Sequence, residues 1–546
     1  MRLLAVLLVW LMGQVALAGG AADVVAAALA DARKLPPELR KEVRYLSLHN
    51  LPEADRPGFL RALAFHVNSL SREAELVVPT GVSPDLLRVS FIDHGWKREV
   101  WEKLAPVEPY FHLLEQRVVK EVEIKAPVAV PTPAPAVLPE PFAEIYVDAP
   151  GGGIRKVPRS AVQPGEWVYV RRNPGDSLQA MKGLPPLSVP EVPRPPPAPP
   201  RPKATPVGLL RNAALHAPWL GKPEVIAELA TLLDSEVPIV RADWFLYRTS
   251  QQVGRGGAGY YDFLGLSSRK DAEELAGLDV KTAQRVRREM AALVDDSGVA
   301  LNNRQVVWYA TVAGSWWETL DADASTGKKN ALRLYDGDYT FDAAEVYFTL
   351  PSGMWGLLAL DNKGNLQDTV PDSIASDGAS RSNDRRIHAG LSCVRCHSEG
   401  IRPIDDWARA TYAGPVAIAS PDPVKLKRLR QLYLSDLPRR VKRDNADYAE
   451  VLARLNGLTP AENAREYALA FENYLERKLS FEDLARELST KPEVFRKALE
   501  TYATAGNADQ VLAAQLARKP RPMRREHAEE LHALMQAVLA TGGKLK

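Results

Sequence analysis

Leu391-Ser-Cys-Val-Arg-Cys-His-Ser-Glu-Gly400 is the stretch that constrains this 546-residue chain most strongly. It contains Cys393 and Cys396, which are the only two cysteines of the chain, and His397 follows them directly. The pattern C-x-x-C-H is the attachment signature of c-type haem, in which two thiols form thioether bonds to the porphyrin and the imidazole binds the iron. The motif therefore predicts one haem c, bound covalently through both cysteines, with His397 as an axial ligand.

The residues around the motif predict a short helix. Ser392 suits an N-cap and Gly400 suits a helix end, so we expect a helix of about two turns over 393–399. On such a helix both cysteines and His397 share one face, because they are spaced by three and four residues. We expect Nε2 of His397 to bind iron while Nδ1–H donates to a backbone carbonyl beyond Gly400, near Pro403.

The second axial ligand of the iron is left open by the sequence. Residues 398–522 contain neither methionine nor histidine. The candidates, besides the histidines nearer the N-terminus, are His388, Met354, Met523, His527, His532 and Met535. Two strong ligands favour electron transfer, whereas an open position permits peroxide chemistry or sensing of a small gas. We expect six-coordinate iron, and therefore an electron carrier rather than an enzyme with its own substrate.

Charged and aromatic side chains near the motif are candidates for the surroundings of the haem. Five arginines are close to it in sequence: Arg381, Arg385, Arg386, Arg395 and Arg402. Either one or two of them neutralise the haem propionates, or they form a solvated basic surface. The tryptophans Trp244, Trp316 and Trp317 either wall the haem pocket or pack in an ordinary core.

The N-terminus predicts export. Met1-Arg2 is followed by an apolar run over 3–12 and by Val15-Ala-Leu-Ala18, an ending typical of a secretory signal that is cleaved after Ala18. A retained signal anchor is the alternative, but we expect no transmembrane span in the mature chain, since no other stretch approaches the ~20 apolar residues of a span. The expected location is periplasmic or extracellular, possibly at the cell envelope. Export agrees with the motif, because bacteria attach c-type haem outside the inner membrane.

Composition excludes one class of partner and indicates spacers. The chain has 70 Lys+Arg against 68 Asp+Glu, so nothing marks a nucleic-acid partner, and the redox partner is left unidentified. Two stretches, 126–136 and 184–206, concentrate many of the 43 prolines. Proline removes backbone donors and favours extended conformations, so these stretches are expected to be semi-rigid spacers.

The patterns along the chain predict an α+β fold, with a mixed helical and strand haem-bearing region, a proline-rich insertion and an all-α C-terminal domain. The expected parts are a signal peptide over 1–18, an N-terminal α+β unit over 23–125, proline-rich spacers over 126–206 that flank a small β-rich insert over 142–183, a cytochrome c-like haem-bearing region over 207–412 and a helical C-terminal domain over 421–546.

Several blocks of sequence carry a family resemblance: Leu86-Leu-Arg-Val-Ser-Phe-Ile-Asp-His-Gly-Trp96, Arg241-Ala-Asp-Trp-Phe245, Ser297-Gly-Val-Ala-Leu-Asn-Asn303, Trp317-Glu-Thr-Leu-Asp321, Leu350-Pro-Ser-Gly353 and Gly390-Leu-Ser-Cys-Val-Arg-Cys-His397. They resemble a group of secreted bacterial monohaem cytochrome c-domain proteins over about half of the chain, and only the C-x-x-C-H part is specific in mechanism. The resemblance implies haem binding and electron transfer. It also implies that residues 40–125 and the haem-bearing region form one body into which 126–206 is inserted.

Three other functions compete with a cytochrome. A thiol–disulfide oxidoreductase would use Cys393 and Cys396 as a redox pair, but no β-α-β pattern surrounds them and His397 follows the pair. A zinc site lacks a second ligand pair at the usual spacing. A scaffold in which haem acts as a sensor or a stabilising group is the third. The G-x-G-x-x-G match at 254–259 lacks the preceding strand of a dinucleotide site, so a loop is expected there.

Overall fold

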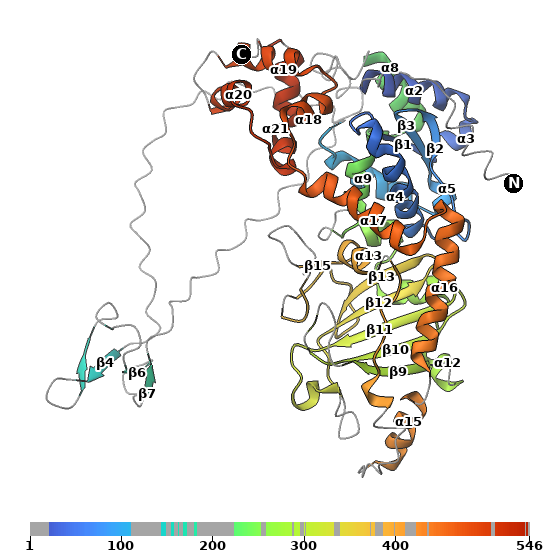
Figure 1. Ribbon diagram of the computed structural model, residues 1–546, viewed down its shortest axis with the longest axis vertical. Helices are drawn as coiled ribbons and strands as arrows, with labels where there is room; N and C mark the ends of the chain where they lie inside the picture. Colours follow the sequence, from blue (N-terminus) through green and yellow to red (C-terminus); the bar gives the residue numbers. More distant parts are fainter. Residues whose placement is uncertain are drawn as a thin grey trace. The chain divides into compact units, whose positions relative to one another are not determined.

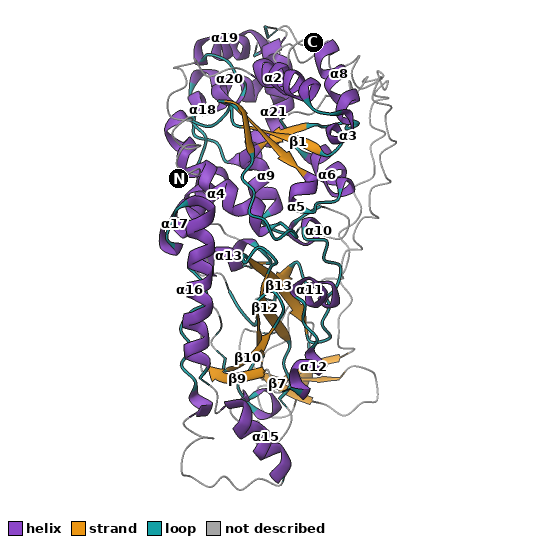
Figure 2. Ribbon diagram, turned by 90° about the vertical axis from the view of Figure 1, so that its right-hand side faces the viewer, coloured by secondary structure: helices purple, strands orange, loops and turns teal. Residues whose placement is uncertain are grey.

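The structure is a computed structural model of the whole chain, shown in Figures 1 and 2. It describes residues 21–110, 144–148, 154–157, 162, 167–171, 179–182, 223–252, 258–286, 289–294, 300, 302–331, 339–371, 373–376, 386–397, 399–409, 422–433, 436–503, 508–540 and 542–543. The chain divides into two compact units, one of residues Met1–Gln116 with Thr205–Lys546 and the other of Arg117–Ala204. Both helices and strands are present among the described residues, which confirms the α+β class.

In the larger unit, a four-stranded sheet joins the two sides of the insertion. Its strands, in spatial order, are β2 (Thr80–Ser83), β3 (Leu86–Ser90), β1 (Val43–Ser47) and β8 (Ile239–Arg241). β3 is antiparallel to β1, whereas β8, which follows the insertion, runs parallel to β1 with Tyr45 opposite Ile239. All five residues of β1 are buried, as expected for a central strand covered on both faces. The flanks of residues 117–204 therefore fold as one body.

Helices cover this sheet. Before the insertion they are α2 (Ala21–Lys34), α3 (Pro37–Arg40), α4 (Arg56–Ser69), α5 (Phe91–His94) and α6 (Arg98–Leu104), with the 3-10 turns η1 (Glu53–Asp55) and η2 (Ala105–Val107). After it come α8 (Pro223–Leu233) and α9 (Ala242–Thr249). The next helices are α10 (Tyr260–Phe263), α11 (Arg269–Ala276) and α12 (Val280–Arg285), of which α11 and α12 lie beside a second sheet (Figure 2). Arg33 of α2 forms a bidentate ion pair with Glu228 of α8, which again joins the two sides of the insertion.

A second sheet of five antiparallel strands forms the other half of the larger unit (Figure 1). Its strands, in chain order and spatial order alike, are β9 (Glu289–Val294), β10 (Arg304–Ala310), β11 (Ser315–Asp321), β12 (Ala343–Thr349) and β13 (Trp355–Asp361), with η5 (Gly327–Lys329) between β11 and β12. Short β14 (Thr369–Val370) and β15 (Ile387–His388) pair beyond it. Neighbours in sequence are neighbours in space, so this is a meander that local hairpins can form.

The C-terminal part is helical in its described residues. Its elements are α15 (Pro423–Tyr433), α16 (Leu437–Asn456), α17 (Pro460–Phe471), the π-helical turn η7 (Glu472–Glu476), α18 (Phe481–Glu487), α19 (Pro492–Tyr502), α20 (Ala508–Arg518) and α21 (Arg525–Ala540). α16 and α17 contribute to the main hydrophobic core, and Glu466 of α17 forms an ion pair with Arg61 of α4. α18 to α21 enclose a second core. Leu429 and Tyr433 of α15 pack in a third, small core, so the described helices after residue 421 divide among three cores.

The smaller unit contains one antiparallel sheet. Its strands, in spatial order, are β5 (Ile154–Lys156), β4 (Glu144–Asp148), β6 (Trp167–Arg171) and β7 (Gln179–Lys182). Ile145, Val147, Val168 and Val170 are buried and form its small core, since alternate residues of each strand face the same side. The expected signal peptide, both proline-rich stretches and residues 254–257 of the glycine motif lie outside the described residues. Within the described parts of the chain, no helix is both long enough and apolar enough to cross a bilayer.

Four buried histidines should make the fold sensitive to acid. Burial lowers the pKa of His49 and His94 to about 4 and that of His66 and His532 to about 3. The unfolded chain therefore binds more protons than the folded one as the pH falls below the ordinary histidine value of about 6.5. Stability present above that pH should decline as the pH falls toward the folded pKa values, by about 1.4 kcal/mol per pH unit for each histidine.

Urea denaturation between pH 7 and pH 5 measures this decline. His66→Gln removes one of the four groups, so its unfolding free energy should fall less than that of the parent, by about 2 kcal/mol over this range. Equal slopes for the two proteins would contradict the assignment of His66 as a buried neutral imidazole.

Candidate functional site

The C-x-x-C-H motif forms helix α13 (Leu391–His397), at the point where the five-stranded sheet meets α17 (Figures 1 and 2). The helix begins two residues earlier than the sequence predicts, and Ser392 is not its N-cap. Gly390 precedes the helix with a left-handed φ of +85°, and Ser392 lies in the first turn, where its hydroxyl accepts a hydrogen bond from the N–H of His388 at 3.1 Å. A Cβ on Gly390 would lie 2.4 Å from the carbonyl oxygen of Ser250, so glycine is required there.

His397 is positioned through its Nδ1 atom. This atom is 3.2 Å from the carbonyl oxygen of Gly400, so the expected backbone acceptor is present, at Gly400 itself rather than beyond it. With Nδ1–H donating to the carbonyl, the Nε2 lone pair is available for a metal. Burial lowers the pKa of His397, and the positive charge of Arg402 lowers it further, whereas the charge of Glu345 opposes the shift. The imidazole is therefore neutral at physiological pH, as a metal ligand must be.

The loop after the motif is attached to α16. Gly400 has φ +105°, and a Cβ there would lie 2.4 Å from Oδ1 of Asn445. The Asn445 side chain accepts a hydrogen bond from the N–H of Ile401 and donates one to its carbonyl, each at 2.8 Å. Both ends of the motif thus rest on segments that are distant in sequence.

The two thiols have different surroundings. Cys393 is 2% exposed, whereas Cys396 is half-buried. Burial raises the pKa of the Cys393 thiol well above its ordinary value, and the negative charge of Glu345, to which the thiol also hydrogen-bonds, raises it further. Reactive cysteines require the opposite environment, one that lowers the pKa and stabilises the thiolate. Cys393 is therefore a protonated thiol at neutral pH.

Strand β12 supplies two neighbours of the motif that sequence reasoning missed. The ring of Tyr347 lies 4.3 Å from that of His397, centroid to centroid, and its hydroxyl donates to Oε1 of Glu345 at 2.6 Å. Glu345 and Tyr347 share one face of the sheet, because they are two residues apart on a strand. Their alternation could be read from the sequence, but only the tertiary structure places that face against α13.

Arg304 is a third missed neighbour. Its positive charge acts on His397, as that of Arg402 does, and its Nε lies 2.9 Å from Oδ1 of Asp321 in a nearly buried ion pair. Of the five arginines expected from sequence proximity, Arg402 and Arg386 are exposed, Arg395 is half-buried, and residues 381 and 385 lie outside the described part of the chain. The nearly buried arginine whose charge acts on His397 is thus Arg304 of strand β10, almost 100 positions away in sequence.

The structure separates most candidate distal ligands from the motif. Met535 and Met523 pack in the core of α18 to α21, which is distinct from the core that contains Cys393. His532 is buried beside Gln536, with Nε2 at 2.7 Å from the amide nitrogen, and His527 is exposed on the same helix. Met354 is fully buried in the main core, and His388 lies in β15 directly before α13.

Three of the upstream histidines have partners of their own, whereas His112 and His216 lie outside the described residues. His66 lies between the hydroxyls of Tyr467 and Thr249, at 3.1 and 2.7 Å. His49 contacts Ser47 at 2.7 Å, and His94 stacks on Trp96 with 4.6 Å between ring centroids. These contacts identify all three as packed structural residues.

The donor set of α13 fits a covalently held haem. Two thiols and one imidazole share a helix face, and the imidazole is oriented by a backbone carbonyl, which is the usual support of a metal-binding histidine.

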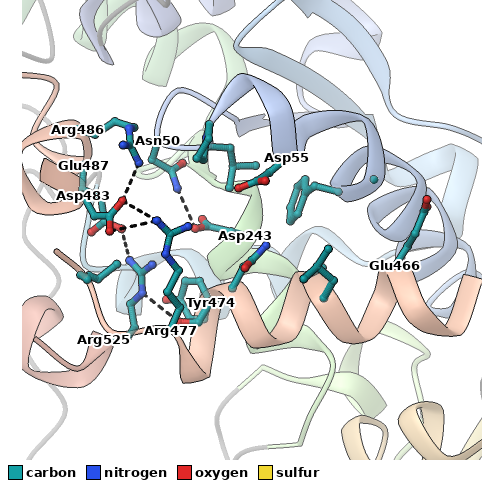
Figure 3. A pocket seen from close by; sticks show the side chains of 18 residues that line it. Asn50, Asp55, Asp243, Glu466, Tyr474, Arg477, Asp483, Arg486, Glu487 and Arg525 are labelled. Atoms are coloured by element: carbon teal, nitrogen blue, oxygen red, sulfur yellow. Dashed lines mark hydrogen bonds and ion pairs between the residues drawn. The ribbon is translucent and has the colours of Figure 1, made fainter. Parts of the chain in front are cut away.

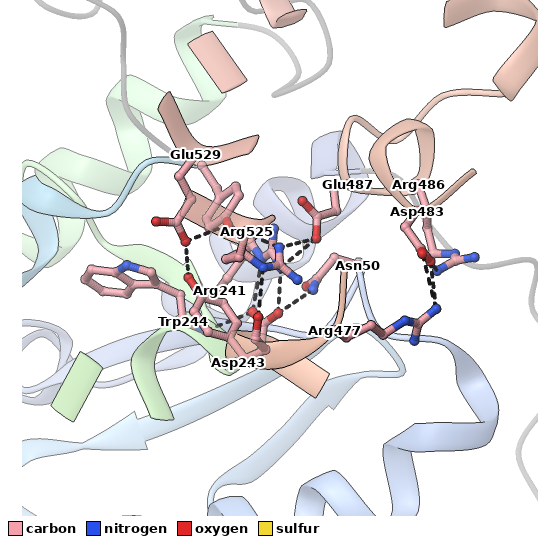
Figure 4. Close-up of polar contacts among 12 residues, drawn as sticks. Asn50, Arg241, Asp243, Trp244, Arg477, Asp483, Arg486, Glu487, Arg525 and Glu529 are labelled. Atoms are coloured by element: carbon pink, nitrogen blue, oxygen red, sulfur yellow. Dashed lines mark hydrogen bonds and ion pairs between the residues drawn. The ribbon is translucent and has the colours of Figure 1, made fainter. Parts of the chain in front are cut away.

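A second cluster of functional groups lies away from α13, among β8, α9, α18 and α21 (Figure 4). Arg241 is fully buried and forms two hydrogen bonds with Asp243, at 3.0 and 2.5 Å, and a contact with Glu487 at 3.3 Å. Arg525 also pairs with Glu487. Although burial raises the carboxyl pKa of Asp243 and of Glu487, the arginine charges outweigh it, so both values lie below the ordinary one.

A cavity of about 60 Å³ adjoins this cluster (Figure 3). Asn50, Asp243, Glu487 and Arg525 line it on one side, and no residue of α13 does. A cavity of this volume holds a few water molecules, and the charged residues Asp243, Glu487 and Arg525 in its lining already have partners in the cluster. The cluster is therefore best understood as a buried structural brace.

Comparisons of the chain with protein-family models, with curated proteins and with solved structures find no match.

The brace generates a stability prediction. Glu487→Gln leaves the guanidinium groups of Arg241 and Arg525 with one carboxylate fewer in a buried site, so it should lower the free energy of unfolding by about 3 kcal/mol. Glu482→Gln is the matched control, since Glu482 is exposed on the same helix and should change stability by less than about 0.5 kcal/mol. Equal losses in the two variants, measured by urea denaturation at pH 7, would show that the ion pairs do not stabilise the fold.

Proposed function

We propose that this chain is an exported c-type cytochrome that binds one haem covalently through Cys393 and Cys396 and transfers single electrons. The observation that carries the proposal is the orientation of the His397 imidazole. Its Nδ1 atom is held by the carbonyl of Gly400, which leaves Nε2 for iron on the same helix face as the only two cysteines of the chain.

The environment of the thiols supports a cytochrome over a thiol–disulfide oxidoreductase. A redox-active C-x-x-C pair depends on a cysteine whose pKa is lowered. Cys393 instead has a raised pKa, because it is buried and faces the Glu345 carboxylate. A buried, protonated thiol is a poor nucleophile, but it can serve as a covalent anchor when a maturation system performs the attachment.

The haem would supply one-electron chemistry at its iron when bound. The chain contributes the covalent anchors Cys393 and Cys396 and the axial imidazole of His397. Tyr347 packs against the imidazole ring and limits its rotation. The positive charges of Arg304 and Arg402 act on the same region and suit the negative charge of haem propionates.

An open iron site is the second candidate function, and the placement of the distal candidates favours it. Met523, Met535 and His532 are packed away from the core that holds Cys393. A five-coordinate or water-ligated iron would bind a small gas or react with peroxide. Resonance Raman spectra of the ferric protein distinguish the two, since a high-spin signal indicates an open site and a low-spin signal two strong ligands.

Haem attachment is tested with protein made in a host that exports and matures c-type cytochromes. The parent should give a pyridine haemochrome spectrum of one haem c per chain, and the haem should stay with the polypeptide after denaturation. Cys393→Ser combined with Cys396→Ser should lose the covalent haem. His397→Ala should change the absorption spectrum of any haem that is attached, because the iron loses its imidazole.

Colourless protein from such a host, with both thiols open to alkylation after unfolding, would overturn the proposal. Alkylation of native haem-free protein provides a further check. Cys396 should react well before Cys393, because Cys393 is buried and its thiol pKa is raised. Fast reaction of Cys393 at neutral pH would instead favour the oxidoreductase.

A further inference from the structure

A row of aromatic side chains crosses the five-stranded sheet from the motif. Tyr347 on β12 is directly opposite Trp317 on β11, and Trp317 is directly opposite Trp308 on β10. Directly opposed residues of antiparallel strands place their side chains on the same face, about 5 Å apart at Cβ. The three side chains, which are 2–5% exposed, therefore lie buried on one face of three neighbouring strands and are named here the aromatic row.

The aromatic row has one end at the haem ligand and the other near the surface. At the first end, Tyr347 lies 4.3 Å from the ring of His397. At the second, the guanidinium carbon of Arg440 lies 4.6 Å from the ring centre of Trp308, and the Arg440 side chain is 18% exposed. Arg440 belongs to α16, which covers this face of the sheet.

Every member of the row has a hydrogen-bond acceptor for its polar hydrogen. The Tyr347 hydroxyl donates to Glu345 at 2.6 Å, Nε1–H of Trp317 donates to Oδ2 of Asp444 at 2.8 Å, and Nε1–H of Trp308 donates to Oγ of Ser315 at 2.9 Å. Two of the acceptors are side chains that carry carboxyl groups. A carboxylate beside a phenol or an indole stabilises the ring when it loses an electron, because it can take the proton or balance the positive charge.

We propose that Tyr347, Trp317 and Trp308 carry single electrons between His397 and the Arg440 side of the sheet. The proposal rests on the proposed function, since it assumes a one-electron centre at His397. Tyrosine and tryptophan are the side chains that one-electron oxidants attack most readily, apart from cysteine. Placed in a row, they replace one long electron transfer by several short ones.

The electrons and protons balance at each step. A strong one-electron oxidant outside the protein takes one electron from Trp308. Trp317 then reduces Trp308, and Tyr347 reduces Trp317 while the phenol proton of Tyr347 moves to Glu345. The centre at His397 gives one electron to Tyr347, which regains its proton from Glu345. The net result is the transfer of one electron from the centre to that oxidant.

Trp316 provides the matched control. It follows Ser315 on β11 and is fully buried like Trp317, but it faces the opposite side of the sheet, where it packs against Phe348 with 5.5 Å between ring centroids. Replacing Trp316 by phenylalanine thus disturbs the same strand and a similar volume without touching the aromatic row.

The test uses the full chain with a ruthenium polypyridyl photosensitiser on a cysteine introduced by Lys442→Cys, at an exposed position two residues from Arg440. In the haem-loaded protein, a laser flash with a quencher creates the oxidised sensitiser, and loss of ferrous haem absorbance gives the rate of electron transfer. Trp317→Phe and Trp308→Phe should each slow this step about tenfold or more. Trp316→Phe should leave the rate unchanged, and thermal denaturation verifies that each variant is folded.

A haem-free arm separates this proposal from the proposed function. The same labelled chain with Cys393→Ser and Cys396→Ser should show a tyrosyl radical by electron paramagnetic resonance after the flash. That signal should vanish in Tyr347→Phe and weaken in Trp317→Phe, but persist in Trp316→Phe. If haem fails to attach, the proposed function is wrong, but the haem-free experiment still tests the aromatic row. The proposal would be overturned if Trp317→Phe and Trp308→Phe left the electron-transfer rate unchanged. It would also be overturned if the tyrosyl radical signal persisted in Tyr347→Phe.

Discussion

Arg241 is the residue at which three distant parts of the chain meet. Its strand pairs with β1 from the N-terminal segment, and its side chain contacts Asp243 and Glu487, the latter from the C-terminal helices. A fully buried guanidinium is tolerated only when its charge is compensated, because an unpaired charge in the interior costs several kcal/mol. Strand pairing and charge compensation must therefore be satisfied together, and this couples the N-terminal sheet to α18 and α21.

The five-stranded sheet helps to fix the position of α13, as the ion pairs of Arg241 fix the N-terminal sheet. Its register determines that Glu345 and Tyr347 emerge on the face toward the motif, and two left-handed glycines allow the chain to approach close neighbours at both ends of the helix. Gly390 approaches the backbone of Ser250, and Gly400 approaches Asn445. The position of His397 is thus supported from α9, β12 and α16 at once, which is the kind of second layer that a metal ligand needs.

The electrostatics around α13 agree with a covalent cofactor better than with a reactive thiol. Cys393 is kept protonated and His397 is kept neutral, both mainly by burial. Catalytic cysteines occur in electropositive, partly exposed places, where the thiolate is stabilised. Here the charge that acts most on Cys393 is the Glu345 carboxylate, while Arg402 and Arg304 act on the imidazole of His397. The same carboxylate accepts the hydrogen bond of Tyr347, so one side chain, Glu345, connects the thiol, the motif and the aromatic row.

The sequence by itself determined those features that depend only on residues close together in the chain. The α+β class and the helices after 421 follow from local periodicity, and the spacing of Cys393, Cys396 and His397 puts them on one helix face. The start of α13 was predicted two residues too late, because Ser392 resembles an N-cap but bonds the N–H of His388 instead. Only the tertiary structure decided that Arg304, Glu345 and Tyr347 surround the motif and that the aromatic row begins there. Such contacts join segments 50 to 100 residues apart, and they depend on strand register and helix packing, which no local pattern of residues encodes.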